Sequence, residues 1–133
     1  MSPTDISETD VRVEVEYTDE FGSWYEDLAE EDQDAVVARV ELLQQLGPAL
    51  GRPAVDNVHQ SQHPNMKDLL AERALRVLFA FDPRRTAVLL IGGNKSAADA
   101  DTPNWNRWYD EYVPMADDLY DAHLVELREE GLT

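Results

Sequence analysis

The chain has 133 residues, of which 28 are acidic and 11 are basic, giving a formal net charge of −17 and a hydrophobic content of 43%. This length and apolar content predict one globular domain, and the acidic balance argues against generic nucleic-acid binding because phosphate groups repel an anionic surface. The absence of cysteine excludes a disulfide framework, a zinc ribbon and thiol catalysis, and with only three histidines we expect neither a metal nor a cofactor.

The N-terminal segment predicts a tail followed by a strand. Residues 1–10 are polar and acidic and show no period, so we expect a disordered acidic tail, with a single domain over residues 11–133. Residues 11–17, VRVEVEY, alternate between apolar and charged side chains. This alternation is typical of a half-buried strand.

Two helices are predicted next. Thr18 or Asp19 can cap the first helix, because both side chains accept hydrogen bonds from free backbone N–H groups. Residues 30–46 form an amphipathic stretch that ends at the Gly-Pro pair of residues 47–48. We expect the two helices to pair as a hairpin.

The middle of the chain predicts a loop and a meander of strands. Residues 47–65 are rich in Gly, Pro, Asn and Ser and are typical of a long loop, which in a compact domain is often functional. Three strand candidates follow, with Pro83 suited to the second position of the tight turn between the last two. Their sequences are MKDLLAE, LRVLFAFD and TAVLLIGG.

The C-terminal part predicts a second loop, residues 94–104, and one or two helices over residues 105–131, with Pro114 starting the longer one. Strands and helices are thus segregated along the chain. This order indicates an α+β fold, a small antiparallel sheet with an N-terminal helical hairpin and a C-terminal helix, all packed on one face.

Charge is unevenly distributed along the chain. Residues 47–98 hold four acidic and seven basic residues, net +3, whereas the segments before and after them have net charges of −12 and −8. No apolar run is long enough to span a bilayer, and the N-terminus lacks a basic region followed by an apolar one. We therefore expect a cytoplasmic protein without a membrane partner.

Basic residues converge on the predicted sheet. Lys67 begins its second strand, Arg76 lies on the third, and Lys95 follows the fourth. Such a patch could hold a phosphodiester, and a metal-free ribonuclease needs a base, cations and an acid. Lys67, one of only two lysines, is the candidate base. The plainer alternatives are a solvated edge lysine at position 67 and an ion pair between Arg76 and Glu72.

Three stretches, SQHPNMKDL, LRVLFAFDPRRTAVLLIGGNK and WNRWYDEYVPMADDLYDAHLVEL, together resemble the phage-derived Gp49-like/HigB branch of the RelE/ParE toxin superfamily. The resemblance runs from about Val11 to Leu127. It implies a RelE-like fold and the toxin of a type II toxin-antitoxin system. Such a toxin is a ribosome-dependent mRNA endoribonuclease that inhibits translation, and a helix-turn-helix antitoxin neutralises it.

Carried over by position, the resemblance implies catalytic roles for Lys67, Arg76, Lys95 and Tyr109. Candidate substrate contacts are His63, Asn65, Arg84, Arg85 and Trp108, although a loop histidine, turn arginines and an aromatic cluster are more often structural. One residue differs from the family pattern: Leu70 occupies a position at which members commonly have Arg. A non-catalytic protein of the same fold is the alternative, either a gyrase-inhibiting ParE-like relative or a decayed toxin that only binds its antitoxin. A weaker alternative is an acidic nucleic-acid mimic.

Overall fold

The computed structural model describes residues 12–72, 75–94 and 105–132, with the side chains of residues 105 and 106 excepted. The elements in chain order are β1 (Val15–Tyr17), α2 (Asp19–Glu26), α3 (Glu30–Leu46), the 3-10 helix η1 (Gly47–Ala49), β2 (Val55–Asn57), β3 (Met66–Leu70), β4 (Leu75–Phe81), β5 (Ala87–Asn94) and α5 (Trp105–Glu129).

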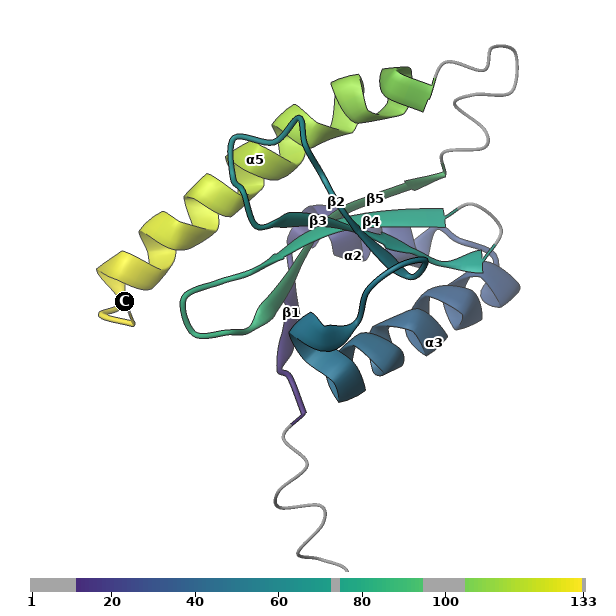
Figure 1. The fold of residues 1–133 in the computed structure, drawn as a ribbon, viewed down its shortest axis with the longest axis horizontal. Helices are drawn as coiled ribbons and strands as arrows, with labels where there is room; N and C mark the ends of the chain where they lie inside the picture. Colours follow the sequence, from purple (N-terminus) through teal and green to yellow (C-terminus); the bar gives the residue numbers. More distant parts are fainter. Residues whose placement is uncertain (1–11, 73–74, 95–104, 133) are drawn as a thin grey trace, which may run out of the picture.

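The five strands form one sheet in the order β1-β5-β4-β3-β2 (Figure 1). Strands β3, β4 and β5 form the predicted antiparallel meander, β2 adds to β3 in antiparallel, and β1 pairs with β5 in parallel. The predicted α+β class is therefore confirmed, with a mixed sheet in place of a wholly antiparallel one.

Both ends of the helical hairpin follow from local sequence. The Thr18 hydroxyl accepts a hydrogen bond from Phe21 N at 3.0 Å, which confirms the predicted cap of α2. The same hydroxyl donates to Leu90 O at 2.6 Å and so ties the cap to β5. Helix α3 ends at Gly47, whose φ of 55° favours glycine, and Gly47 N donates to Leu43 O.

Helices cover both faces of the sheet (Figure 1), so the expectation that all helices pack on one face was wrong. Helices α2 and α3 pack on one face through a core that includes Phe79 and Leu89, and α5 packs on the other through a core that includes Leu78 and Leu90. The physical reason lies in β4 and β5, whose buried residues run consecutively instead of alternating. A strand that is apolar on both faces needs cover on both.

Two consecutive glycines allow this three-layer packing. A Cβ atom at Gly92 would overlap the indole ring of Trp24 on α2, and a Cβ atom at Gly93 would lie 2.9 Å from Nε1 of Trp108 on α5. Successive residues of a strand point to opposite faces. The Gly-Gly pair therefore lets one tryptophan from each helix layer lie directly against β5.

Other predictions were less accurate. Strand β2 lies within the predicted loop of residues 47–65, and α5 is one helix that contains Pro114 instead of starting there. Pro114 is exposed, so water at the helix surface can replace the donor that proline lacks. The predicted tail, residues 1–10, lies outside the described residues. Within the described ranges, no helix is both long enough and apolar enough to cross a bilayer.

Candidate functional site

Lys67 and Arg76 lie on opposite faces of the sheet. Lys67 pairs in register with Phe79, a residue of the α3-side core, and its neighbour Asp68 points to the other face. Arg76 bonds Asp68 on that other face, beneath α5. The expected single cationic patch was therefore wrong for these two residues. Lys95, the third predicted cation, lies outside the described residues.

Asp68 joins two of the predicted catalytic residues on the α5 face. Its side chain is 1% exposed, and its Oδ2 atom accepts hydrogen bonds from Arg76 Nη1 at 2.8 Å and from the Tyr109 hydroxyl at 2.5 Å. Arg76 lies on β4 and Tyr109 on α5, so the contact joins the sheet to the helix. We call Asp68, Arg76 and Tyr109 the Asp68 cluster. The arrangement neutralises a buried carboxylate and leaves the guanidinium 17% exposed.

Tyr109 is held in its protonated form. Burial raises the pKa of its hydroxyl above the ordinary value of 10.0, and the hydrogen bond to Asp68 raises it further. A phenol in this state can donate a hydrogen bond or a proton, but it cannot serve as a base at neutral pH.

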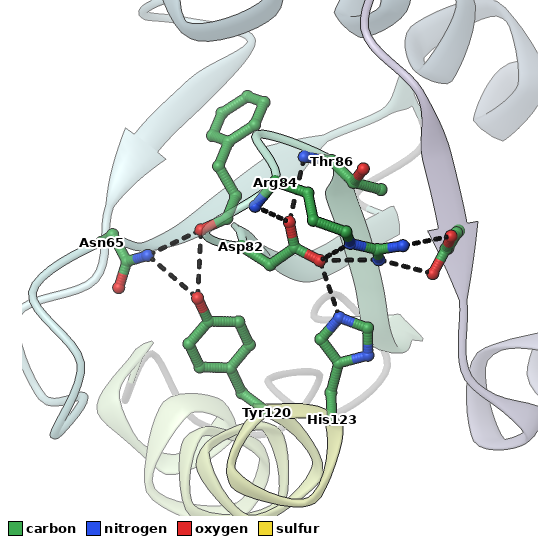
Figure 2. A network of polar contacts seen from close by, with 8 residues as sticks. Asn65, Asp82, Arg84, Thr86, Tyr120 and His123 are labelled. Carbon is green, nitrogen blue, oxygen red and sulfur yellow. Dashed lines mark hydrogen bonds and ion pairs between the residues drawn. The ribbon is translucent and has the colours of Figure 1, made fainter. Parts of the chain in front are cut away.

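A second carboxylate network lies at the β4–β5 turn (Figure 2). Asp82 is buried, and its Oδ2 accepts from Arg84 Nη2 at 2.7 Å and contacts His123 Nε2 at 2.8 Å. Its Oδ1 accepts from the backbone N–H groups of Arg84 and Thr86. Arg84 also forms a two-point pair with Glu16 on β1, at 2.9 and 3.1 Å. The network thus ties β1, the turn and α5 together.

The charges of this network stabilise one another. Burial raises the pKa of Asp82, but hydrogen bonds from Arg84, His123 and Thr86 outweigh it and leave the pKa below its ordinary value of 3.8. Hydrogen bonds to Glu16 and Asp82 raise the pKa of Arg84. The Arg84 guanidinium, predicted to contact substrate, is therefore engaged by two carboxylates.

Arg85, the second arginine of the turn, has a different environment. Its side chain is exposed and its φ is 68°, in the left-handed region. Its backbone N–H donates to Asp82 O at 2.7 Å, which closes a turn with Pro83 at the second position, as predicted. Arg85 remains a candidate contact for an anion.

His63 and Asn65 have structural partners at α5. His63 Nε2 lies 2.8 Å from Asp121 Oδ1, and its ring meets that of Tyr120 edge to face. Asn65 Nδ2 donates to Phe81 O at 2.9 Å and to the Tyr120 hydroxyl at 3.3 Å (Figure 2). These contacts fasten the long loop to the C-terminal helix and account for both residues without a substrate.

Trp108 is a core residue. It is 1% exposed and contacts both Gly93 and the ring of Tyr112. A ring buried in this way is not available to stack on a base, which was its predicted role. Sequence reasoning also missed the central roles of Asp68 and Asp82. The sequence features that could have indicated these roles are a carboxylate within a predicted strand, Asp68, and a carboxylate directly before the turn proline, Asp82. Within the described residues, no group of three or more His, Asp or Glu side chains is placed to hold a metal ion.

Most of the chain is similar in sequence to known proteins. Residues 23–121 match the model of the family described as Phage derived protein Gp49-like (DUF891). A Mycobacterium tuberculosis protein named "Putative toxin HigB2" is 40% identical over 111 residues, which are 80% of this chain and 52% of that protein. The chain thus spans about half the length of that relative. Another, "Putative toxin HigB3", is 45% identical over 95 residues, 71% of this chain and 78% of that protein.

Solved structures share the fold. The M. tuberculosis RelBE2 toxin-antitoxin complex contains a chain that matches with a TM-score of 0.51 at 16% identity, over 63% of this chain and 99% of that one. The Escherichia coli DinJ-YafQ toxin-antitoxin complex matches with a TM-score of 0.51 at 14% identity, over 65% and 97%. Isolated E. coli RelE toxin matches with a TM-score of 0.51 at 7% identity, over 66% and 94%.

Proposed function

Because the chain belongs to the phage-derived Gp49-like family, we propose that it is the toxin of a type II toxin-antitoxin pair and that it inhibits translation by cleaving mRNA on the ribosome. The observation that carries this proposal is the identity of 40% and 45% with two proteins named as HigB toxins. The neutralising partner would be an antitoxin of the helix-turn-helix class, encoded beside the toxin.

The Asp68 cluster supports a cleavage site on the α5 face. Arg76 and Tyr109 are the two predicted catalytic residues that the structure brings together, 2.8 and 2.5 Å from the same carboxylate oxygen. An arginine that keeps some of its donors open can bind a phosphate oxygen through its planar fork. Lys95 directly follows the last residue of β5, and its role in cleavage stays a prediction.

In the proposed reaction, the 2′-oxygen of the substrate attacks the adjacent phosphorus while the bond from phosphorus to the 5′-oxygen breaks. The products are a 2′,3′-cyclic phosphate and a free 5′-hydroxyl. The 2′-hydroxyl gives its proton to water, and the leaving oxygen takes one from Tyr109, which then regains a proton from water. Arg76 would stabilise the added negative charge of the phosphorane.

A specific observation also favours a non-catalytic toxin. Arg76 and Tyr109 both direct a donor to Asp68, and Lys67 lies on the other face, so the charge available to a phosphate is smaller than the sequence predicted. A protein of this kind would bind its antitoxin without cleaving RNA.

Induction of the toxin with and without the adjacent antitoxin gene tests the proposal. We expect growth arrest with cleaved, ribosome-associated mRNA, relieved by the antitoxin. Arg76→Lys keeps a charge beside Asp68 but loses the planar fork, and should slow cleavage by about tenfold or more. Arg128→Lys, an exposed change on α5, is the matched control. Antitoxin binding without arrest would identify the non-catalytic toxin, and arrest with DNA damage would identify a gyrase inhibitor.

A further inference from the structure

We propose that Lys67 belongs to a second RNA-binding site, on the α3 face of the sheet, which holds another nucleotide of the strand cleaved at the Asp68 cluster. This inference rests on the proposed function. It begins from a pocket of about 270 Å³ between η1, β2, β3 and β4, whose lining includes Lys67, Arg52, Phe79 and Phe81. We call it the Lys67 pocket.

The Lys67 pocket carries positive charge that is not cancelled. Lys67 Nζ donates to the neutral Asn57 Oδ1 at 2.6 Å and forms no ion pair with any residue that the structure describes. Arg52, at the rim, is 80% exposed and lies 3.7 Å from Asp56. Such an exposed pair is weak, because water screens it. The pocket thus holds two cations, Lys67 and Arg52, and one carboxylate, Asp56, in a chain whose net charge is −17. This local excess of positive charge favours an anionic ligand.

The walls of the pocket favour a ligand that is also flat and apolar. The rings of Phe79 and Phe81 meet edge to face with centroids 5.6 Å apart, and Phe81 is partly exposed while Phe79 is buried. Pro48, Leu50 and Val55 add to the apolar lining. A base against aromatic and aliphatic side chains, with its phosphate at an ammonium group, is the usual arrangement for single-stranded nucleic acid.

The topology allows one strand of RNA to reach both sites. Lys67 pairs with Asn57 on β2, which is the edge strand of the sheet. Lys67 lies on β3, one strand from the edge of the sheet, and neighbouring strands are about 4.8 Å apart. Asp68, the next residue, points to the other face of the sheet, where it bonds Arg76. A single strand that bends around β2 would therefore contact Lys67 on one face and Arg76 on the other.

Binding of a 2′-O-methyl hexanucleotide, which cannot be cleaved through its 2′-oxygen, tests the Lys67 pocket by fluorescence anisotropy. We expect Lys67→Gln to raise Kd by about three- to tenfold and to reduce the slope of log K against log salt by about 0.7, the value for one lost phosphate contact on a single strand. Lys67→Arg should retain most of the affinity. Phe81→Leu keeps an apolar wall without a ring and should weaken binding with little change in the salt slope.

Arg128→Gln removes one positive charge from an exposed position of α5 and serves as the matched control. Equal Kd values for the wild type, Lys67→Gln and Arg128→Gln, with unchanged melting temperatures, would overturn the Lys67 pocket as an RNA site. So would a Lys67→Gln variant that loses only antitoxin binding. If the wild type cleaves mRNA and Lys67→Gln binds RNA normally, this inference alone fails. If Lys67→Gln loses RNA binding and the wild type never cleaves, the proposed function alone fails.

Discussion

The Arg76 guanidinium lies 2.8 Å from Oδ2 of the buried Asp68, across the β3–β4 pairing. Removing one partner of such a pair leaves an uncompensated charge, so we expect Arg76→Ala to lower the free energy of unfolding by about 3 kcal/mol. Asp68→Asn combined with Arg76→Ala should cost less than the sum of the single changes. Urea denaturation of the four proteins in this cycle measures the coupling. Strict additivity would show that the pair contributes nothing to stability.

Asp82 should make the fold sensitive to acid. Its pKa is lowered in the folded state, so its contribution to stability is complete above the ordinary value of 3.8 and is lost as the pH falls through the lower folded value. Asp82→Asn should destabilise the protein by about 3 kcal/mol at neutral pH. It should also flatten the loss of stability below about pH 4. Denaturation midpoints between pH 7 and pH 2 test this, and parallel curves for the two proteins would contradict it.

Tyr109 should have the opposite pH dependence. Its raised pKa means that the folded state favours the neutral phenol, so this contribution is present below pH 10.0 and is lost as the pH rises above it. Tyr109→Phe removes the hydrogen bond to Asp68 and should cost about 1–2 kcal/mol at neutral pH. The stability difference between the two proteins should shrink in alkaline solution. A difference that stays constant to pH 11 would show that the phenol titrates normally.

Gly93 should not tolerate a side chain. A Cβ atom there would lie 2.9 Å from Trp108 Nε1, so Gly93→Ala must displace a fully buried ring and should cost about 1–3 kcal/mol. Adding Trp108→Phe, which shortens that side chain, should recover part of the loss. Thermal unfolding of both variants measures it. Gly51→Ala, at a position where a Cβ meets nothing within 4 Å, is the control.

Sequence patterns predicted the elements well because their causes are local. The Thr18 cap, the end of α3 at Gly47 and the turn at Pro83 each depend on the conformational preference of one or two residues. Strand β2, with three residues in a loop rich in Gly and Pro, carries too short a pattern to detect. Helix α5 continues through Pro114 because that position is open to solvent and the rest of the helix packs on the sheet. The periodicity of the sequence gives no information on either condition.

The prediction that Lys67 and Arg76 share one patch was wrong because it depends on the register between β3 and β4. Lys67 and Arg76 are nine positions apart across a hairpin, and their relative faces depend on where β3 ends and β4 begins. A shift of one residue in the pairing would move Arg76 to the face of Lys67. The sequence also did not predict that Arg76 and Tyr109 meet at Asp68, because this contact requires α5 to lie on the face opposite to α2 and α3.

Of the strands that the structure describes, β1 is the first and β5 the last, and the two pair with each other. The bond between the Thr18 hydroxyl and Leu90 O spans 72 positions. During synthesis, β1 therefore has no partner until β5 has emerged from the ribosome. Pairing of such distant segments is slow. Until β1 returns, the edge of β5 is open to strands of other chains, and at high concentration self-association at this edge competes with folding.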